Sequence, residues 1–225
     1  MSRTLTPLCD FVRAYAESDA HRLHMPGHKG ASVLGCEAFD ITEIDGADVL
    51  YHPNGILAQS QNIARDLFGA KKTLYSAEGS SLSIRAMLYL AQLDAKYNGR
   101  SQTVLAARNA HKVFLSAAAL LDFPMVWLYG EENSGLLSCH ITPAALEDVL
   151  SSTDTPPAAV YITSPDYFGV MSDVKAIAEI CKRHGVPLLV DNAHGAYLRF
   201  CSPPVTRWIW VPICAVIRHT KLCPC

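Results

Sequence analysis

The feature that most constrains the fold is an alternation of short apolar runs and helical stretches between residues 72 and 191. The apolar runs read KTLYS, TVLAA, MVWLY, AAVYIT and PLLVD. Helical patterns lie around Leu82–Leu93, Lys112–Leu121, Pro143–Ser151 and Val174–His184. Apolar strands separated by helices are typical of a mostly parallel sheet with helices on both faces. The sequence therefore predicts an α/β fold.

The last of these helices carries clear end signals. Ser172 or Asp173 can cap its first turn, and basic residues occupy its last turn. Gly185 follows as a helix-ending residue, and Pro187 opens the next strand. These signals support the division into helix and strand.

The beginning of the chain follows another pattern. Apolar residues at helical spacing predict an amphipathic helix over Thr4–Ser18. The segment HRLHMPGHKG comes next and predicts a loop, because it is rich in proline, glycine and histidine. We expect an N-terminal helix and loop segment over 1–55, an α/β domain over 56–200 and a tail of different character over 201–225.

Composition excludes several classes of protein. The chain has 225 residues, of which 50% are hydrophobic, and a net charge of -2. This balance provides no basic surface for nucleic acid or membranes. Asp10 interrupts the N-terminal segment before a secretory signal can form, and WIWVPICAVI is too short to span a bilayer. We expect a cytoplasmic protein with no nucleic-acid or membrane partner.

The eight cysteines fall into two groups. One group is scattered and is typical of buried thiols in a reducing compartment: Cys9, Cys36, Cys139 and Cys181. The other group lies in the tail near His219: Cys201, Cys214, Cys223 and Cys225. The tail lacks the C-x2-C pair of strong zinc signatures, so we expect no metal site.

Ligands of open α/β sheets bind beyond the carboxyl ends of the strands. The segment SAEGSSLSIRAML places Gly79, Ser80 and Ser81 at the start of a helix. Free backbone N–H groups, the helix dipole and two hydroxyls suit a phosphate group. A simple serine N-cap is the alternative, since neither a Walker-type lysine nor a G-x-G-x-x-G motif is present.

Two further strand ends carry polar residues. His111 follows TVLAA, where it has either a functional or a purely structural role. Asp191 ends the strand PLLVD, where a buried carboxylate needs a cationic partner. Ala193 is small enough to let a flat group approach, and His194 follows it. A phosphate cradle, a stacking imidazole and a strand-end carboxylate together suit pyridoxal phosphate.

Several motifs resemble one branch of the fold-type-I pyridoxal-phosphate enzymes, the Orn/Lys/Arg decarboxylase family. They are HMPGHKG, DITEIDGADVLYHPNGILAQSQNIARDLFGAKKTLYSAEGSS, RNAHK, SPDYFGV and VDNAHGAYLRF. They occur in the family's order over about residues 5 to 200. The resemblance implies a partial aminotransferase-like large domain and pyridoxal 5'-phosphate as the cofactor.

The resemblance also implies residue roles. Gly79, Ser80 and Ser81 would hold the cofactor phosphate, and His111 would stack on the pyridine ring. Asp191 would pair with the ring nitrogen, beside which Ala193 and His194 would lie, although His194 also fits a structural role. The family motif would place Pro26, Gly27, His28 and Lys29 on the substrate side. Lys29 is also consistent with a simple loop cation.

The activity that the resemblance implies is decarboxylation of a small basic amino acid: arginine, lysine or ornithine. The product would be a diamine or agmatine. Family members would form homodimers or higher homo-oligomers, whose sites are completed across the subunit interface.

The family attaches its cofactor to a lysine about thirty residues beyond D-x-A-H, within an S-x-H-K pattern. Lys221 lies near that distance, but CAVIRHTKLCPC contains no S-x-H-K. Codons for 208–225, read one nucleotide earlier, permit D-L-G-A-D-M-C-C-D-S-A-H-K-T-L-P-V. We therefore interpret the tail as a frameshift that begins near Phe200 or Cys201.

This interpretation leads to one expectation, beside which two alternatives stand. The chain as written is expected to be inactive, because it lacks the attachment lysine and the later parts of the family fold. The alternative is a non-catalytic paralogue that binds the cofactor or a full-length partner. A serine hydrolase built on Asp191 and His194 is disfavoured, because the chain has no G-x-S-x-G elbow.

Overall fold

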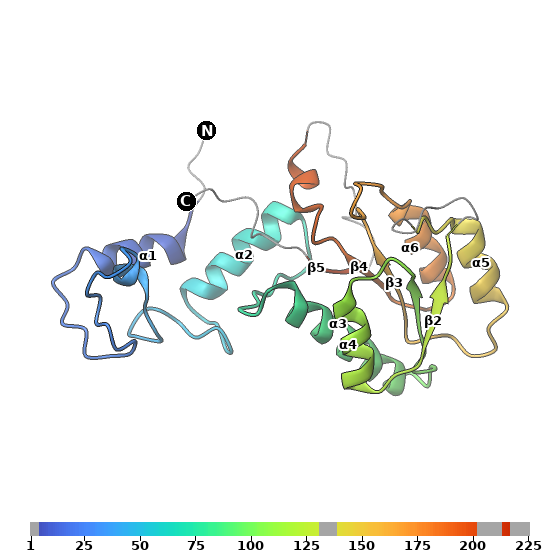
Figure 1. The fold of residues 1–225 in the computed structure, drawn as a ribbon, viewed down its shortest axis with the longest axis horizontal. Coiled ribbons are helices and arrows are strands. Elements are labelled where there is room, and N and C mark those ends of the chain that lie inside the picture. The colour runs from blue at the N-terminus through green and yellow to red at the C-terminus, as the bar shows by residue number, and fades with distance from the viewer. Residues whose placement is uncertain (1–4, 131–138, 202–212, 217–225) are drawn as a thin grey trace. The chain divides into compact units, whose positions relative to one another are not determined.

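A computed structural model describes residues 5–130, 139–201 and 213–216 of the chain (Figure 1). The chain folds as two compact units, Met1–Tyr75 and Ser76–Cys225. The first unit extends beyond the boundary at residue 55 in the sequence-based division. None of the helices in the described ranges is long and apolar enough to cross a membrane.

The first unit contains helices α1 (Pro7–Ala16) and α2 (Ile56–Phe68) and the short 3-10 helix η1 (Glu37–Phe39). Helix α1 lies within the predicted range and begins at Pro7, a position where proline costs no hydrogen bond. Helix α2 was not predicted, because its N-terminus is capped from a distance. The cap is Asp48, whose carboxylate accepts the N–H groups of Gly55 at 2.7 Å and Leu57 at 3.0 Å.

Two carboxylates organise the loops of this unit. Burial alone would raise the pKa of Asp48, but N–H donors led by Asn54 and Val49 outweigh it and lower this pKa to about 2. The N–H of Leu34 is the main cause that lowers the pKa of Glu37 to about 2. Backbone N–H groups that surround one carboxylate thus replace regular secondary structure here.

The second unit is built on a five-stranded parallel sheet of order β2-β1-β3-β4-β5. The strands are β1 (Val104–Ala107), β2 (Met125–Leu128), β3 (Ala159–Thr163), β4 (Leu188–Asp191) and β5 (Ile213–Val216). The helices are α3 (Gly79–Tyr97), α4 (Lys112–Leu121), α5 (Pro143–Ser151) and α6 (Val174–Arg183), and the 3-10 helix η2 (Ala196–Phe200) follows β4. The predicted α/β fold with a parallel sheet is confirmed.

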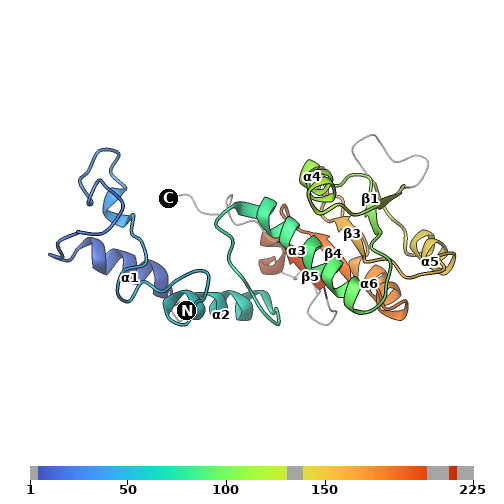
Figure 2. The ribbon, with the colours of Figure 1, turned by 90° about the horizontal axis from the view of Figure 1, so that it is seen from below.

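Side chains of successive strand residues separate into two cores. Tyr161 of β3 and Leu189 of β4 pack with α3 and α4, whereas Val160 and Val190 pack with α5 and α6. Figures 1 and 2 show the two helix pairs on opposite sides of the strands. Because strand side chains alternate between faces, Asp191 projects to the same side as Leu189, under α3 and α4.

One predicted strand is wrong. The segment KTLYS forms no strand, and Leu74 within it is 66% exposed. A run of β-forming residues needs a neighbouring strand and a face to bury, and this segment has neither. The other four predicted strands are confirmed to within one residue, and α4 and α5 have the predicted bounds.

The sheet gains its fifth strand from the tail. Strand β5 pairs in parallel with β4, with Ile213 opposite Leu188 and Val216 opposite Asp191. A run within WIWVPICAVI therefore covers the edge of β4 that would otherwise present unpaired backbone groups.

Candidate functional site

The carboxyl edge of the sheet brings three loops together. Since all five strands are parallel, the residues after β1, β3 and β4 leave the sheet at the same edge. The first loop contains His111, the second begins at Ser164 and the third contains Asn192–His194. The polar residues that the sequence placed at strand ends thus share one edge.

Helix α3 begins at this edge, because its far end is fixed to the opposite one. Gln92 donates to the carbonyl of Gln102 before β1, at 3.1 Å. Arg100, just beyond α3, donates to the carbonyls of Pro157 at 3.0 Å and Ala158 at 2.7 Å, before β3. A 19-residue helix is about 28 Å long, so its first turn lies at the carboxyl edge.

Asp191 is the most deeply buried acid of this edge, with only 3% of its surface exposed. Its Oδ2 accepts the hydroxyl of Tyr161 at 3.1 Å, and its Oδ1 accepts the N–H of Ala193 at 3.1 Å. No lysine, arginine or histidine in the described ranges forms an ion pair with it. A buried carboxylate with two neutral donors still favours a cation.

Tyr161 was not among the predicted site residues. It lies on β3 with its side chain fully buried, and burial, followed by the charge of Asp191, raises the pKa of its hydroxyl far above the usual range. The phenol hydroxyl is the donor of this hydrogen bond to Asp191. A tyrosine within an apolar strand is typical of a core residue, so no sequence pattern indicates this contact.

His111 is the N-cap of α4. Its Nδ1 accepts the N–H of Val113 at 3.2 Å, which leaves the proton of the neutral ring on Nε2. The structural role that the sequence left open is therefore present. The imidazole is half-buried, so it also remains available on the carboxyl edge.

The first turn of α3 carries Gly79, Ser80 and Ser81. Gly79 opens the helix with φ +66°, a conformation that favours glycine. The N-cap is Glu78, which makes no side-chain cap hydrogen bond. The simple serine N-cap is thus wrong, because both serines lie inside the helix. The N–H groups of this turn have no side-chain cap, as an anion site requires.

Ala193 and His194 follow Asp191 in a tight turn. The rings of His194 and Tyr167 lie 5.2 Å apart between centroids, so the loops after β4 and β3 meet there. A Cβ on Gly195 would overlap Asn192 Oδ1 and lie 2.5 Å from Pro165 Cδ, so only glycine allows this close approach.

Unpaired polar atoms mark the same edge. Buried side-chain atoms without a hydrogen-bond partner, among the residues that the structure describes, are Arg85 Nε, Asn109 Oδ1, Thr163 Oγ1 and Asn192 Oδ1. Three of these belong to the ends of β1, β3 and β4 or to the loops that follow. Buried polar atoms normally have partners, so a polar ligand fits here. Asp191 supplies the charge that a protonated pyridine would need.

Pro26, Gly27, His28 and Lys29 belong to the first unit. His28 Nε2 lies 3.3 Å from Asp40 Oδ2. The Lys29 ammonium donates to the carbonyls of His24 at 2.5 Å and Leu23 at 3.4 Å. The reading of Lys29 as a loop cation thus has support, and its role toward a substrate stays a prediction.

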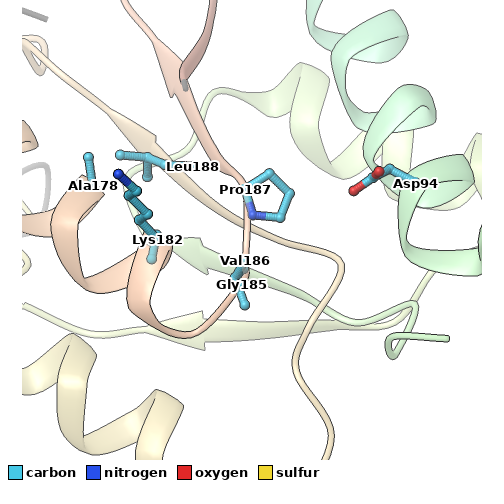
Figure 3. Close-up of a pocket in the computed structure, with 8 residues that line it drawn as sticks. Asp94, Ala178, Lys182, Gly185, Val186, Pro187 and Leu188 are labelled. Atoms are coloured by element: carbon cyan, nitrogen blue, oxygen red, sulfur yellow. The ribbon is translucent and has the colours of Figure 1, made fainter. Parts of the chain in front are cut away.

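The opposite edge of the sheet holds an apolar hollow of about 280 Å³ (Figure 3). It lies next to the start of β4. The residues that line it are Asp94, Ala178, Cys181, Lys182, Gly185, Val186, Pro187 and Leu188. Burial raises the pKa of the Cys181 thiol to about 12, which disfavours the reactive thiolate form. The described ranges contain no cluster of metal-ligating residues. Lys221 and most of the tail cysteines lie outside the side chains that the structure describes.

Two solved structures share part of this fold. The chain matches rice (Oryza sativa) TDC with PLP and tryptamine at a TM-score of 0.51 and 17% identity, over 65% of this chain and 36% of that one. Mouse CSAD in apo form matches at a TM-score of 0.51 and 21% identity, over 64% and 33%. At these identities the likeness shows the fold alone.

Curated relatives are more similar in sequence. Arginine decarboxylase of Halalkalibacterium halodurans is 34% identical over 208 residues, which is 87% of this chain and 40% of the relative. Arginine decarboxylase of Bacillus subtilis is 30% identical over 212 residues, which is 89% and 42%. The chain thus spans about two fifths of the length of these relatives.

The family comparison covers nearly all of the described structure. The sequence model of "Orn/Lys/Arg decarboxylase, major domain" matches residues 6–208. That match covers most of both units, the carboxyl edge with Asp191 and every motif on which the resemblance was based. The chain therefore belongs to the Orn/Lys/Arg decarboxylase family.

Proposed function

We propose that the carboxyl edge of the second unit binds pyridoxal 5'-phosphate, as part of a decarboxylase of basic amino acids. The observation that carries the proposal is the buried carboxylate of Asp191, which has no cation in the described ranges and lies among unpaired polar atoms. The pyridine nitrogen of the cofactor would supply the missing cation. Curated relatives named arginine decarboxylase support the reaction class.

Each group at this edge has a part in holding the cofactor. The uncapped first turn of α3, with Gly79, Ser80 and Ser81, would bind the phosphate through N–H groups and hydroxyls. His111 would lie against the ring, since its Nδ1 is fixed by the α4 cap. Asp191 would keep the ring nitrogen protonated, with Ala193 and His194 beside the ring.

The cofactor, when bound, supplies an electron sink for the bond between Cα and the departing carboxylate of the substrate. The chain's own residues would orient the ring and hold its proton. Pro26, Gly27, His28 and Lys29 would act on the substrate side. Arginine, lysine and ornithine are the substrate candidates, and arginine follows the curated relatives.

We further propose that the chain as written does not turn over substrate. No S-x-H-K surrounds Lys221, and the codons of the tail permit that motif in another frame. The domain division 1–55, 56–200 and 201–225, a homodimer or higher homo-oligomer and a cytoplasmic location belong to the same proposal. The non-catalytic paralogue is the second candidate, and it is favoured by this lack of an attachment motif.

The experiment compares the chain as written with a variant in which residues 201–225 are encoded one nucleotide earlier. Each is loaded with pyridoxal phosphate, reduced with borohydride and mapped by mass spectrometry for a lysyl adduct. We expect retained cofactor without an adduct in the first protein, and an adduct at the restored lysine in the second. Release of labelled CO2 from arginine, lysine and ornithine is measured in parallel.

Three results would contradict parts of the proposal. Ordinary turnover by the chain as written would overturn its inactivity, as would an adduct that Lys221→Ala removes. Failure of both proteins to retain the cofactor would overturn the binding site. Sequencing of the coding region decides the frameshift, and co-purification with a full-length family member would favour the paralogue.

A further inference from the structure

Tyr161 connects two groups that are assigned to the proposed cofactor, Asp191 at the ring nitrogen and His111 at the ring face. Its hydroxyl donates to Asp191 Oδ2 at 3.1 Å. Its ring packs on Phe114 of α4, with 4.8 Å between centroids. Phe114 lies in the first turn of α4, and its N–H donates to the carbonyl of His111 at 2.8 Å. One side chain therefore touches both the acid and the helix that carries the imidazole.

Strand geometry explains why this residue occupies that place. Tyr161 is paired with Leu189 in the sheet, two residues before Asp191, and both project to the face under α3 and α4. A tyrosine side chain is long enough to reach along this face to the end of the neighbouring strand. Phenylalanine would fill the same space but would leave Asp191 Oδ2 without its donor.

We infer that Tyr161 is a positioning residue, which holds the Asp191 carboxylate in place for the ring nitrogen of the cofactor. The inference rests on the proposed function, since it assigns an effect at the same site. Tyr161 does not itself touch the cofactor: it acts through Asp191. Its hydroxyl fixes one carboxylate oxygen and the N–H of Ala193 fixes the other, so the direction of the carboxylate is set before the cofactor binds.

The test measures binding of two probes, pyridoxal phosphate and its 1-deaza analogue, in which carbon replaces the ring nitrogen. The proteins are the full chain, Tyr161→Phe and, as a matched control, Tyr97→Phe, whose side chain is 90% exposed. We expect Tyr161→Phe to weaken binding of pyridoxal phosphate about tenfold, the effect of one hydrogen bond to a charged group. Binding of the analogue should not change, because it has no ring nitrogen for Asp191 to hold.

A double variant gives a second readout. In the Asp191→Asn background, Tyr161→Phe should no longer alter the affinity for pyridoxal phosphate, because the two residues act as one unit. A merely structural role of Tyr161 would weaken both probes equally and would add to the effect of Asp191→Asn.

The outcomes separate the inference from the function on which it rests. Equal affinities of Tyr161→Phe and the unaltered chain would overturn the inference, as would equal weakening of both probes, while leaving the binding site in place. Absence of pyridoxal-phosphate binding by the unaltered chain would overturn the proposed function itself, and the inference with it.

Discussion

The two edges of the parallel sheet satisfy their polar groups in different ways. At the amino edge Arg100 binds the carbonyls of Pro157 and Ala158 and pairs with Asp94, and Gln92 binds the carbonyl of Gln102. At the carboxyl edge Asp191 has no cation in the described ranges, and several buried polar atoms have no partner. The first arrangement stabilises the fold, whereas the second leaves polar groups that the proposed cofactor would pair.

The largest loss of stability is expected from a substitution at the amino edge. Arg100→Ala should lower the free energy of unfolding by about 3 kcal/mol, because it leaves two carbonyls without their charged donor. Urea unfolding followed by circular dichroism measures this change. Arg65→Ala, which breaks an exposed pair with Asp66, is the control and should have little effect. An equal loss of unfolding free energy in both variants would contradict the stabilising role of Arg100 at these carbonyls.

Close packing at the carboxyl edge predicts the next effect. Gly195→Ala should cost about 2 kcal/mol, because the new Cβ meets Asn192 and Pro165. Gly169→Ala in the loop after β3 is the matched control. A Cβ there meets nothing within 4 Å, so only the strain of its φ of +83° remains, about 1 kcal/mol. Thermal unfolding of the two variants distinguishes overlap from strain, and a smaller loss in Gly195→Ala would contradict the prediction.

Two residues that cap helices separate an effect on stability from an effect on cofactor binding. His111→Ala and Thr142→Ala each remove a cap, and each should lower stability by about 1 kcal/mol. Only His111→Ala should also weaken pyridoxal-phosphate binding. Fluorescence titration with the cofactor measures the affinity. An unchanged affinity in His111→Ala would show that His111 only caps the helix and does not contact the cofactor.

The smallest effect concerns pH at the α5–α6 contact. Glu147 binds His184 at 2.9 Å and Arg183, and these bonds lower its pKa from 4.5. A lowered folded-state pKa gives stability that is present above pH 4.5 and lost as the pH falls further. Between about pH 5 and about pH 3 the unaltered chain should therefore lose more stability than Glu147→Gln does. Parallel pH profiles of the two proteins would contradict this.

The sequence predicted much of the second unit and less of the first. Strand periodicity and end signals located β4 and α6, and Asp173, one of the two predicted cap candidates, is the cap of α6. Helix α2 was missed, because its cap comes from Asp48 rather than from a neighbour. Local patterns carry no record of such distant contacts.

The site was predicted in the same partial way. Asp191 was identifiable, because an acid at the end of an apolar strand needs a partner. Tyr161, Asn109 and Asn192 were not, since their contacts or their lack of partners depend on the sheet order. The KTLYS strand failed because β propensity does not supply a neighbouring strand.

The central claim is that the Asp191 carboxylate at the carboxyl edge serves to bind a cofactor and does not stabilise the fold. Calorimetric titration of pyridoxal phosphate into the unaltered chain and Asp191→Asn tests it directly, together with urea unfolding of both proteins. The account predicts about a hundredfold loss of affinity in Asp191→Asn without a loss of stability. Equal affinities, or a variant that is destabilised as strongly as Arg100→Ala, would contradict it.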